Sequence, residues 1–222
     1  MPLAIKYIFA VLCALLLSFA AASAEDERTF EVSEFDRIDV SAGINVIAEV
    51  GQPQSIVVRT DNGDYTDFKI AVKNGALYVS RDWNRLRWHQ KKSSYKVIVT
   101  TPTLRGLDAS SGSQAKISNV AASRFDIDLS SGAYAKVEGA CEDCTVDLSS
   151  GARLKAQELE CETVNIDVSS GGHGEISASR AVLADASSGG HFTVYGNPER
   201  VNIDKSSGGR IYVAATAQAT RD

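Results

Sequence analysis

The sequence has no second long apolar run and no excess of basic residues. Beyond an apolar segment near the N-terminus, no stretch of its 222 residues is long and apolar enough to predict a transmembrane helix. The chain has 23 Lys and Arg against 28 Asp and Glu, a formal net charge of −5 at pH 7. We therefore expect neither a nucleic-acid partner nor a membrane-spanning domain.

The N-terminal apolar segment predicts a secretory signal peptide. Lys6 precedes the run YIFAVLCALLLSFA, and small residues follow it up to Ala22-Ser23-Ala24. A bilayer needs about 20 apolar residues, which is more than this run supplies, so we expect cleavage after Ala24 rather than a retained anchor. The mature protein would then be periplasmic or extracellular. The expected segments are a signal peptide, 1–24, an N-terminal extension, 25–34, a β-structured domain, 35–213, and a flexible tail, 214–222.

Helical spacing of apolar residues is also missing, and the pattern Asp-x-Ser-Ser-Gly recurs in its place. It occurs six times, starting at Asp108, Asp128, Asp147, Asp167, Asp185 and Asp204. The glycines that end the six copies are 20, 19, 20, 18 and 19 residues apart. A repeat this short is typical of a solenoid.

Apolar and polar residues alternate on both sides of each motif. Around the second copy, the apolar positions are Phe125, Ile127, Leu129, Ala135 and Val137. Such alternation predicts strands with one buried face. Each repeat would then hold two clear strands around a glycine corner that needs a positive φ, together with a looser third segment. Strands that cannot pair within one repeat pair with the next repeat, so the sequence predicts a parallel β-helix with coils of about 19 residues.

The first half of the chain repeats less regularly. The stretch FDRIDVSAGINVIAEV, 35–50, contains a degenerate corner that ends at Gly43. Further alternating segments follow, and Asn74-Gly75 between two of them is a two-residue hairpin signal. We expect this N-terminal hairpin region to cover a sheet edge that would otherwise be exposed at the end of the solenoid.

The stretch around Gly43-Ile44-Asn45, the following IAVKNGALYVS and the Ser-Ser-Gly repeats resemble the GIN-domain family, described as head domains of auto-transporter adhesins. The resemblance covers the chain from about Phe35 to Val213. It implies an all-β fold, a right-handed parallel β-helix, in a protein of the bacterial envelope. The handedness is implied by the resemblance alone.

Two sets of repeated side chains could bind a metal ion. Stacked coils would place the six motif aspartates in one row about 4.8 Å apart, where carboxylates repel one another or collect cations such as Ca²⁺. Alternatively, each carboxylate accepts hydrogen bonds from the backbone of its own corner. His173 and His191, each two residues after a motif glycine, would stack and offer two ligands to a transition metal, or simply stay exposed. No other cofactor is expected.

Two of the four cysteines fall at the same position of adjacent repeats. Cys141 and Cys161 each lie ten residues before the next motif glycine, so we predict a disulfide between them. Cys144 occupies an inward position and is expected to be buried and free. The alternative is a redox pair within Cys-Glu-Asp-Cys, but this would need a helix N-terminus that the sequence does not predict.

The most distinctive segment outside the repeats is RDWNRLRWHQKK, 81–92, which holds both tryptophans of the chain. Five basic residues and one aspartate give it a local charge of +4. Basic and aromatic side chains together suit anionic headgroups, acidic glycans or lipopolysaccharide. The candidate ligand-binding residues are Arg81, Trp83, Arg85, Arg87, Trp88, His89, Lys91 and Lys92. Alternatively, the segment is a long hairpin connection whose tryptophans cover the end of the core.

No catalytic triad is predicted, because the serine pair recurs six times and none of these serines is a unique nucleophile. We expect a non-catalytic secreted protein, an adhesin-like binding or scaffolding module for an envelope glycan, lipid or protein. One alternative is a carbohydrate-active β-helix enzyme on acidic polysaccharide, although the repeats between 108 and 213 contain no insertion that could wall a groove. The other is a purely structural element that forms homo-oligomers.

Overall fold

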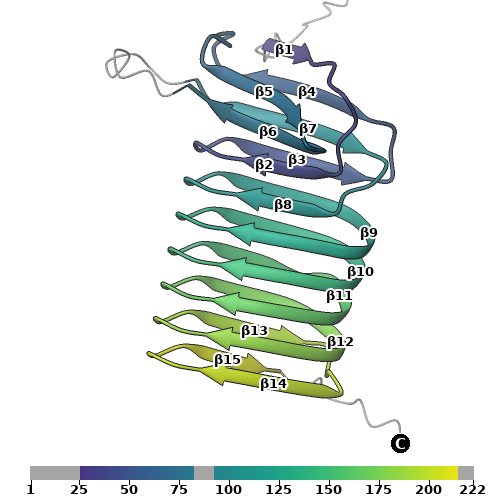
Figure 1. Cartoon of the computed structure of the whole chain (residues 1–222). Helices are drawn as coiled ribbons and strands as arrows, with labels where there is room; N and C mark the ends of the chain where they lie inside the picture. The colour runs from purple at the N-terminus through teal and green to yellow at the C-terminus, as the bar shows by residue number, and fades with distance from the viewer. Residues whose placement is uncertain (1–25, 83–92, 215–222) are drawn as a thin grey trace, which may run out of the picture.

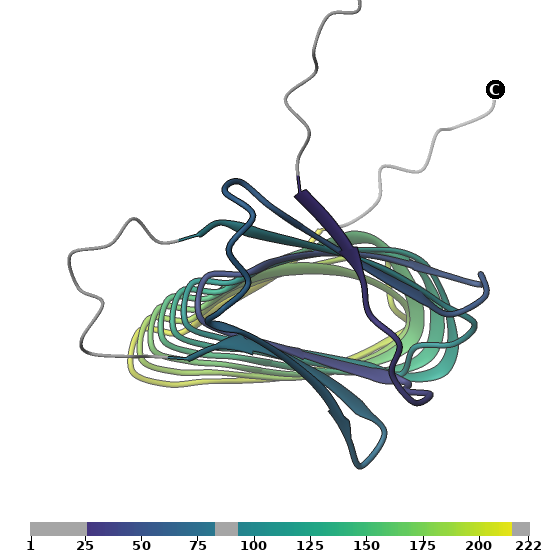
Figure 2. The same ribbon diagram turned by 90° about the horizontal axis from the view of Figure 1, so that it is seen from above.

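The computed structural model describes residues 26–82 and 93–214, and all regular structure in these ranges is β-strand. Parallel strands about 20 residues apart in the sequence stack into a β-solenoid of about five turns. Figure 1 shows the coils one above the other, and Figure 2 shows that they enclose a flattened oval. In Figure 1 the chain runs leftward along the near side, returns on the far side and descends, so the coil is right-handed. The predicted all-β parallel β-helix is confirmed.

Four long strands form the regular part of the solenoid: β9 (Gln114–Leu129), β10 (Tyr134–Leu148), β11 (Arg153–Val168) and β12 (His173–Ala186). Each begins after one Ser-Ser-Gly corner, bends round the opposite edge and ends before the next corner (Figure 1). In these four coils the looser third segment is therefore part of a continuous strand, whereas in the last repeat it separates β13 (His191–Tyr195) from β14 (Arg200–Lys205). The strands stay paired round the bend. A shift in register there, such as the one between Lys136 and Gly139 of β10, accommodates the change of direction.

The corners divide the surface of the solenoid into two long faces. The pre-corner face contains β8 (Gly106–Ala109), the second halves of β9 to β12, and β14 (Arg200–Lys205). The post-corner face contains the first halves of β9 to β12, together with β13 (His191–Tyr195) and β15 (Arg210–Val213). Since alternate residues point outward, each face presents rows of side chains that stack from coil to coil.

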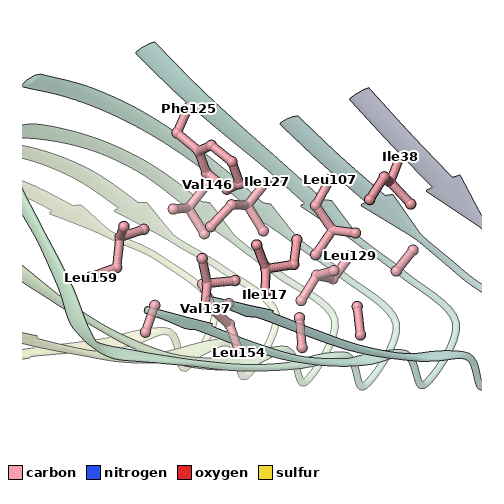
Figure 3. Close-up of a cluster of buried hydrophobic side chains, with 14 of the residues drawn as sticks. Ile38, Leu107, Ile117, Phe125, Ile127, Leu129, Val137, Val146, Leu154 and Leu159 are labelled. Atoms are coloured by element: carbon pink, nitrogen blue, oxygen red, sulfur yellow. The ribbon is translucent and has the colours of Figure 1, made fainter. Parts of the chain in front are cut away.

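Aliphatic side chains fill the space between the two faces (Figure 3). Ile38, Leu107, Ile127 and Val146 stand in one register row, and each is at most 1% exposed. Burial of each such side chain contributes about 1.5–3 kcal/mol to the stability of the folded state. Because the same inward position recurs in every coil, a short repeat in the sequence produces one continuous core.

Each corner is a tight turn in which both central residues have positive φ. In the first motif these are Ser111 (φ 53°) and Gly112 (φ 71°), and Ser113 N donates to Ser110 O at 3.1 Å. Two left-handed residues define a type I′ turn. The second serine of all six copies has this conformation, whereas the sequence interpretation assigned positive φ to the glycine alone.

Hydrogen bonds also join each corner to the next. Gly112 N donates to Ser131 O at 3.0 Å, and the corresponding bond recurs at the next four corners. The amide that closes each turn and the motif glycine amides of the first five corners are therefore bonded to serine carbonyl oxygens, within the turn and between coils respectively.

The coils at the N-terminal end do not follow the order of the sequence. β2 (Arg37–Val40) and β3 (Asn45–Val50) form a coil that pairs on one side with β8 and β9. On its other side it pairs with β6 (Ala76–Arg81) and β7 (Tyr95–Thr101). Strands that come later in the chain are thus stacked outside β2 and β3, as Figure 1 shows.

Antiparallel strands and an aromatic cluster cover this end. β5 (Phe68–Lys73) pairs with β6 through the predicted hairpin at Asn74-Gly75, which is confirmed. β4 (Ser55–Thr60) pairs antiparallel with β7, and β1 (Asp26–Thr29), within the predicted extension 25–34, pairs with β4. The rings of Phe30, Tyr65, Phe68 and Tyr95 pack with centroids 4.9–6.5 Å apart.

The C-terminal end has no comparable cover among the described residues. β14 pairs only with β12, and β15 pairs only with β13. Val201 on β14 is 44% exposed, and Tyr212 on β15 is 66% exposed. Among the described residues, no strand therefore pairs with the outer edge of β14 or β15.

Candidate binding surface beside the corners

Seven aspartates form one outward row on the pre-corner face. Asp39 and the six motif aspartates are register partners from β2 to β14. Within the described part of the chain, Asp108 is the one member of this row with an ion pair. The idea that each carboxylate accepts hydrogen bonds from its own corner is wrong. In the first corner Ser110 N donates to Val40 O, Gly112 N to Ser131 O and Ser113 N to Ser110 O, and no hydrogen bond of the described residues joins a corner amide to its motif aspartate.

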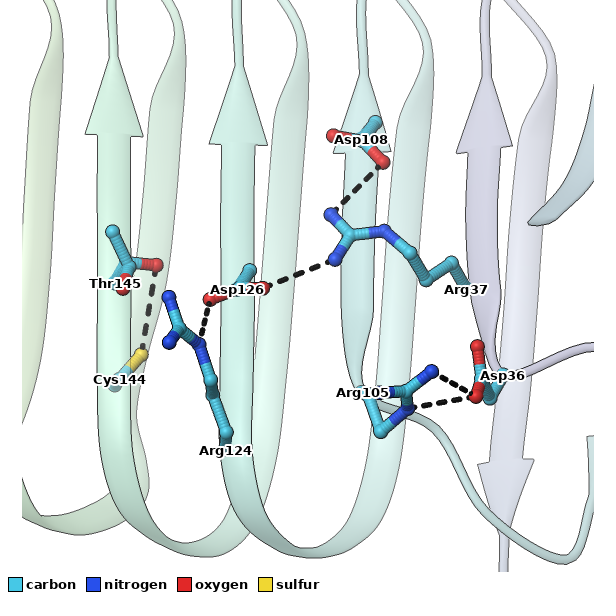
Figure 4. A network of polar contacts seen from close by, with 8 residues as sticks. All are labelled: Asp36, Arg37, Arg105, Asp108, Arg124, Asp126, Cys144 and Thr145. Atoms are coloured by element: carbon cyan, nitrogen blue, oxygen red, sulfur yellow. Dashed lines mark hydrogen bonds and ion pairs between the residues drawn. The ribbon is translucent and has the colours of Figure 1, made fainter. Parts of the chain in front are cut away.

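Arg37 holds the N-terminal part of this face together (Figure 4). Its guanidinium donates to Asp108 at 3.3 Å and to Asp126 at 3.0 Å. It crosses β8 over Gly106, where an added Cβ would lie 2.6 Å from Arg37 Cζ. Arg124 donates to the other oxygen of Asp126 at 3.1 Å. Burial alone would raise the pKa of Asp126, but the hydrogen bonds and charges of the two arginines lower it.

Farther along the row the carboxylates repel one another. Burial and the neighbouring Asp108 raise the pKa of Asp128, although Arg37 partly offsets them. Burial and the neighbours Asp128 and Asp167 raise the pKa of Asp147. A single row offers fewer oxygens than the 6–8 ligands that Ca²⁺ takes, so calcium binding here stays a prediction.

The post-corner face carries the opposite charge. Lys116, Lys136 and Lys155 are register partners on β9, β10 and β11. Lys136 is paired with Glu138 at 2.5 Å and with Glu158 at 3.4 Å. Lys116 and Lys155 form no ion pair with any described residue. Each of the three lysines lies four residues after a motif glycine, a recurrence that the sequence interpretation overlooked.

A second row lies two residues closer to the corners and contains Arg153, His173, His191 and Arg210. The two imidazole rings are stacked, with centroids 5.2 Å apart and 8° between their planes. His173 Nδ1 lies 2.8 Å from Gly171 O, which places its ring proton on Nδ1 and leaves Nε2 as the acceptor. At His191 this acceptor faces Arg210 Nη1 at 3.4 Å, so a shared metal between the two histidines also stays a prediction.

We call these two rows the basic face. It consists of Lys116, Lys136, Lys155, Arg153, His173, His191 and Arg210. The aspartate row and the basic face lie on opposite sides of the corner edge. The aspartate row is therefore concentrated on one long face and most of the cations of the repeats on the other, although Glu138 and Glu175 also lie on the basic face.

The segment 81–92 belongs to an enlarged corner. Four residues separate Val40 from Asn45 in the β2–β3 coil, whereas sixteen separate their register partners Val79 and Lys96 in the β6–β7 coil. β6 and β7 do not pair with each other, so the alternative of a hairpin connection is wrong. By register, the end of β6 and the start of β7 stand where the β2–β3 coil has its own corner. Seven candidate ligand residues lie outside the described residues: Trp83, Arg85, Arg87, Trp88, His89, Lys91 and Lys92.

Arg81, the eighth candidate, connects the end of β6 with the start of the β7 side of this segment. Its Nη2 donates to Ser93 O at 2.7 Å, and its guanidinium lies 5.0 Å from the centroid of the Tyr95 ring. Ser94 N donates to Asp61 Oδ1 at 2.9 Å. The two ends of the segment are therefore fixed to the capped end of the solenoid.

The cysteines lie inside the solenoid. Cys141 and Cys161, register partners on β10 and β11, are joined by an S–S bond of 2.02 Å. Their shared position in the repeat predicts this pairing, and the alternative bond between Cys141 and Cys144 is not formed. Burial raises the pKa of the free Cys144 thiol to about 12, so this thiol is a poor nucleophile at neutral pH.

The predicted signal peptide, 1–24, lies outside the described residues, as does most of the predicted tail. Among the residues that are described, no helix is long and apolar enough to cross a membrane.

Solved structures of other bacterial proteins share the fold. A crystal structure named as a putative adhesin from Bacteroides fragilis is 21% identical, with a TM-score of 0.65 over 85% of this chain and 96% of that one. One named as a putative lipid binding protein from Parabacteroides distasonis is 15% identical, with a TM-score of 0.51 over 87% and 98%. A putative adhesin from Parabacteroides merdae is 12% identical, with a TM-score of 0.52 over 87% and 98%. No curated protein is significantly similar in sequence to this chain.

The family comparison covers most of the solenoid. Residues 34–198 match the family described as "Putative auto-transporter adhesin, head GIN domain". This range contains the β2–β3 coil, the N-terminal hairpin, the enlarged corner and five of the six repeated corners. The chain belongs to the GIN-domain family.

Proposed function

We propose that the protein is a non-catalytic, adhesin-like binding module of the bacterial envelope, and that it holds an anionic surface polymer such as an acidic glycan or lipopolysaccharide. The observation that carries the proposal is the basic face. Lys116, Lys155 and Arg153 form no ion pair with the described residues. The seven-aspartate row lies on the opposite face, and Glu138 and Glu175 are the carboxylates that share this face with the lysine row. Cations without internal partners attract anionic ligands.

The repeat makes this face suited to a long ligand. Neighbouring coils are about 4.8 Å apart, so a polymer that runs along the solenoid axis meets a cation on successive coils. Each single contact is weak, but contacts made by one chain at linked sites add to the avidity. The names of the structural neighbours, adhesins and a lipid-binding protein, are in keeping with a ligand at a cell surface.

The enlarged corner would extend this surface at the capped end. Segment 81–92 contributes a charge of +4 and both tryptophans of the chain. Arg81 is committed to Ser93 and Tyr95, so its role in the proposal is to hold the segment rather than to contact the ligand.

The experiment measures binding of the purified protein to lipopolysaccharide, to anionic vesicles and to an acidic polysaccharide, in separate titrations at low and high salt. Tryptophan fluorescence reports on segment 81–92, because Trp83 and Trp88 are the only tryptophans. Sedimentation with the ligand reports on the whole molecule. We expect salt-sensitive binding in at least one titration.

Matched charge variants test which surface of the protein binds the ligand. Lys116→Gln with Lys155→Gln is expected to weaken binding at least about fivefold, because two cations leave the basic face. Lys69→Gln with Lys73→Gln, on β5, removes the same charge from another surface and should have little effect. Arg87→Ala with Lys91→Ala tests the enlarged corner. Absence of binding to all three ligands at low salt, or equal losses in the β9–β11 and β5 variants, would contradict the proposal.

A further inference from the structure

On the last coil of the solenoid, β14 pairs with β12, and no other described residue pairs with its outer edge. Ser206 N, just beyond the strand, donates to Ala186 O at 3.0 Å. Since the N–H and C=O of alternate residues point to opposite sides of a strand, Val201, Ile203 and Lys205 direct theirs away from β12. An edge of this kind pairs readily with another strand.

The side chains along this edge form a charge palindrome centred on Asn202. Moving outward from Asn202, the matching residues are Val201 with Ile203, Arg200 with Asp204, and Glu199 with Lys205. When two identical strands pair antiparallel about one residue, each residue before the centre faces its match after the centre in the other strand. Pairing about Asn202 therefore places every cation opposite an anion and every aliphatic residue opposite an aliphatic residue.

Lys205 departs from the pattern of the other coils. The residue after the motif aspartate is buried and apolar in the five preceding copies, at Ala109, Leu129, Leu148, Val168 and Ala186. Lys205 is exposed and forms no ion pair with any described residue. In the palindromic pairing Lys205 lies opposite Glu199 of the second copy. This lysine, which breaks the apolar pattern of the repeat, then has an ion-pair partner.

Other centres of pairing are less favourable. Centring on Ile203 places Val201 opposite Lys205 and leaves Arg200 opposite Ser206. Centring on Val201 places Glu199 opposite Ile203. Apolar residues opposite apolar residues and charges opposite charges of the other sign fix the register of a strand pair, and pairing about Asn202 satisfies both.

We propose that two copies of the chain dimerise through their C-terminal coils, with β14 antiparallel to β14 of the second copy about Asn202. The two-fold axis of this pair lies perpendicular to the solenoid axis, so it also sets β15 against β15 of the second copy on the other face (Figure 1). The contact is isologous and closes on itself. Because an isologous contact uses the same β14 edge of both copies, it leaves no β14 edge free for a third copy, and association stops at the dimer.

Light scattering after size exclusion, together with sedimentation velocity over a wide concentration range, tests the proposal. The purified protein is expected to be a dimer. Arg200→Glu places a glutamate opposite Asp204 of the other copy at both symmetry-related positions. The resulting repulsion should raise the dissociation constant of the dimer at least about tenfold. Arg200→Asp with Asp204→Arg makes the pair complementary again and should restore the dimer. The control Arg153→Glu makes the same charge change on the basic face and should leave the dissociation constant unchanged.

A cysteine cross-link tests the register. At the centre of the pair the two Asn202 residues do not share hydrogen bonds, and their Cα atoms would lie about 4.5 Å apart, within disulfide range. Asn202→Cys is therefore expected to give a covalent dimer under mild oxidation. Asn165→Cys, in the same outward row on β11, should not. A protein that is monomeric at all concentrations, with an exposed edge lysine that only prevents pairing, overturns the proposal. So does a dimer that is unaffected by Arg200→Glu and not cross-linked through Asn202→Cys.

Discussion

The second serine of each corner adopts a backbone conformation that most side chains avoid. Ser150 has φ 50° and is followed by Gly151 with φ 71°. Serine tolerates this conformation less well than glycine or asparagine but far better than a β-branched residue. A serine at this position therefore lowers the stability of each corner slightly while keeping a small polar surface.

Replacing this serine tests the turn. Ser150→Val is expected to lower the free energy of unfolding by about 1–2 kcal/mol, because a β-branched side chain is strained at positive φ. Ser150→Asn should have little effect. Urea denaturation measures both, with Ser149→Val, at the preceding position of the turn, as the control. Equal losses in Ser149→Val and Ser150→Val would contradict the conformational explanation.

The two kinds of aspartate on the pre-corner face predict opposite effects on stability. The raised pKa of Asp147 means that the folded state binds its proton more tightly than the unfolded state, so stability decreases as the pH rises through the window from about 3.9 to the raised pKa. The pKa of Asp126 is lowered, so its contribution is present at neutral pH and is lost as the pH falls through the folded-state pKa.

At pH 7, Asp147→Asn is accordingly expected to stabilise the protein and Asp126→Asn to destabilise it, each by about 0.5 kcal/mol because both carboxylates are partly exposed. Thermal unfolding across a pH series measures this difference. Both effects should vanish at about pH 2, where the carboxyl groups are protonated in the folded and the unfolded states. A destabilising Asp147→Asn at neutral pH would show that the carboxylates of the aspartate row do not repel one another.

At the scale of strands, the coils differ in how they fill the same inward position. Ala115, Ala135 and Leu154 stand in one row with Gly174 and Phe192. A Cβ added at Gly174 would lie 2.2 Å from Phe192 Cε2. The glycine of β12 thus makes room for the aromatic ring of β13, and the two residues form one packing unit.

Gly174→Ala is expected to lower the free energy of unfolding by about 1–3 kcal/mol through overpacking. Phe192→Leu in the same chain should recover part of this loss, because a smaller side chain leaves space for the added methyl group. A double-mutant cycle by urea denaturation measures the coupling. Additive effects of the two substitutions would contradict a shared packing site.

At the scale of the molecule, the two ends of the solenoid are unequal. The central strands β10 and β11 pair on both sides, whereas β14 and β15 pair on one side only. Stability in a solenoid is approximately the sum of the contributions of neighbouring repeats. Among the coils of the repeats, the last one has one such neighbour and should open first.

Among the strands from β9 to β15, hydrogen exchange is expected to be slowest in β10 and β11 and fastest in β14 and β15, because local opening follows the number of paired edges. Mass spectrometry of exchanged peptides at low protein concentration measures this order. Arg200→Glu should not alter it, since the variant affects association rather than the isolated chain. Uniform exchange along the solenoid would mean that the molecule opens only as a whole.

Local patterns in the sequence were sufficient for the regular half of the molecule. Alternation around Ile127 and Leu129 predicted which residues are buried, and the common spacing of Cys141 and Cys161 placed them side by side. The lysine row was equally accessible, because Lys116, Lys136 and Lys155 recur at one position of the repeat. Such inferences work because neighbouring coils are also neighbouring repeats, so contacts in space follow a fixed separation in the chain.

By itself, then, the sequence determined the parallel β-helix, its corners and the rows of side chains on its faces, since each depends on a period that can be counted. Only the tertiary structure decided that β6 and β7 stack outside β2 and β3, that segment 81–92 enlarges a corner and that Arg37 reaches Asp126 across β8. These features join residues at separations that do not repeat. Their energy depends on which strands meet, and alternation along a single strand contains no information about its neighbour.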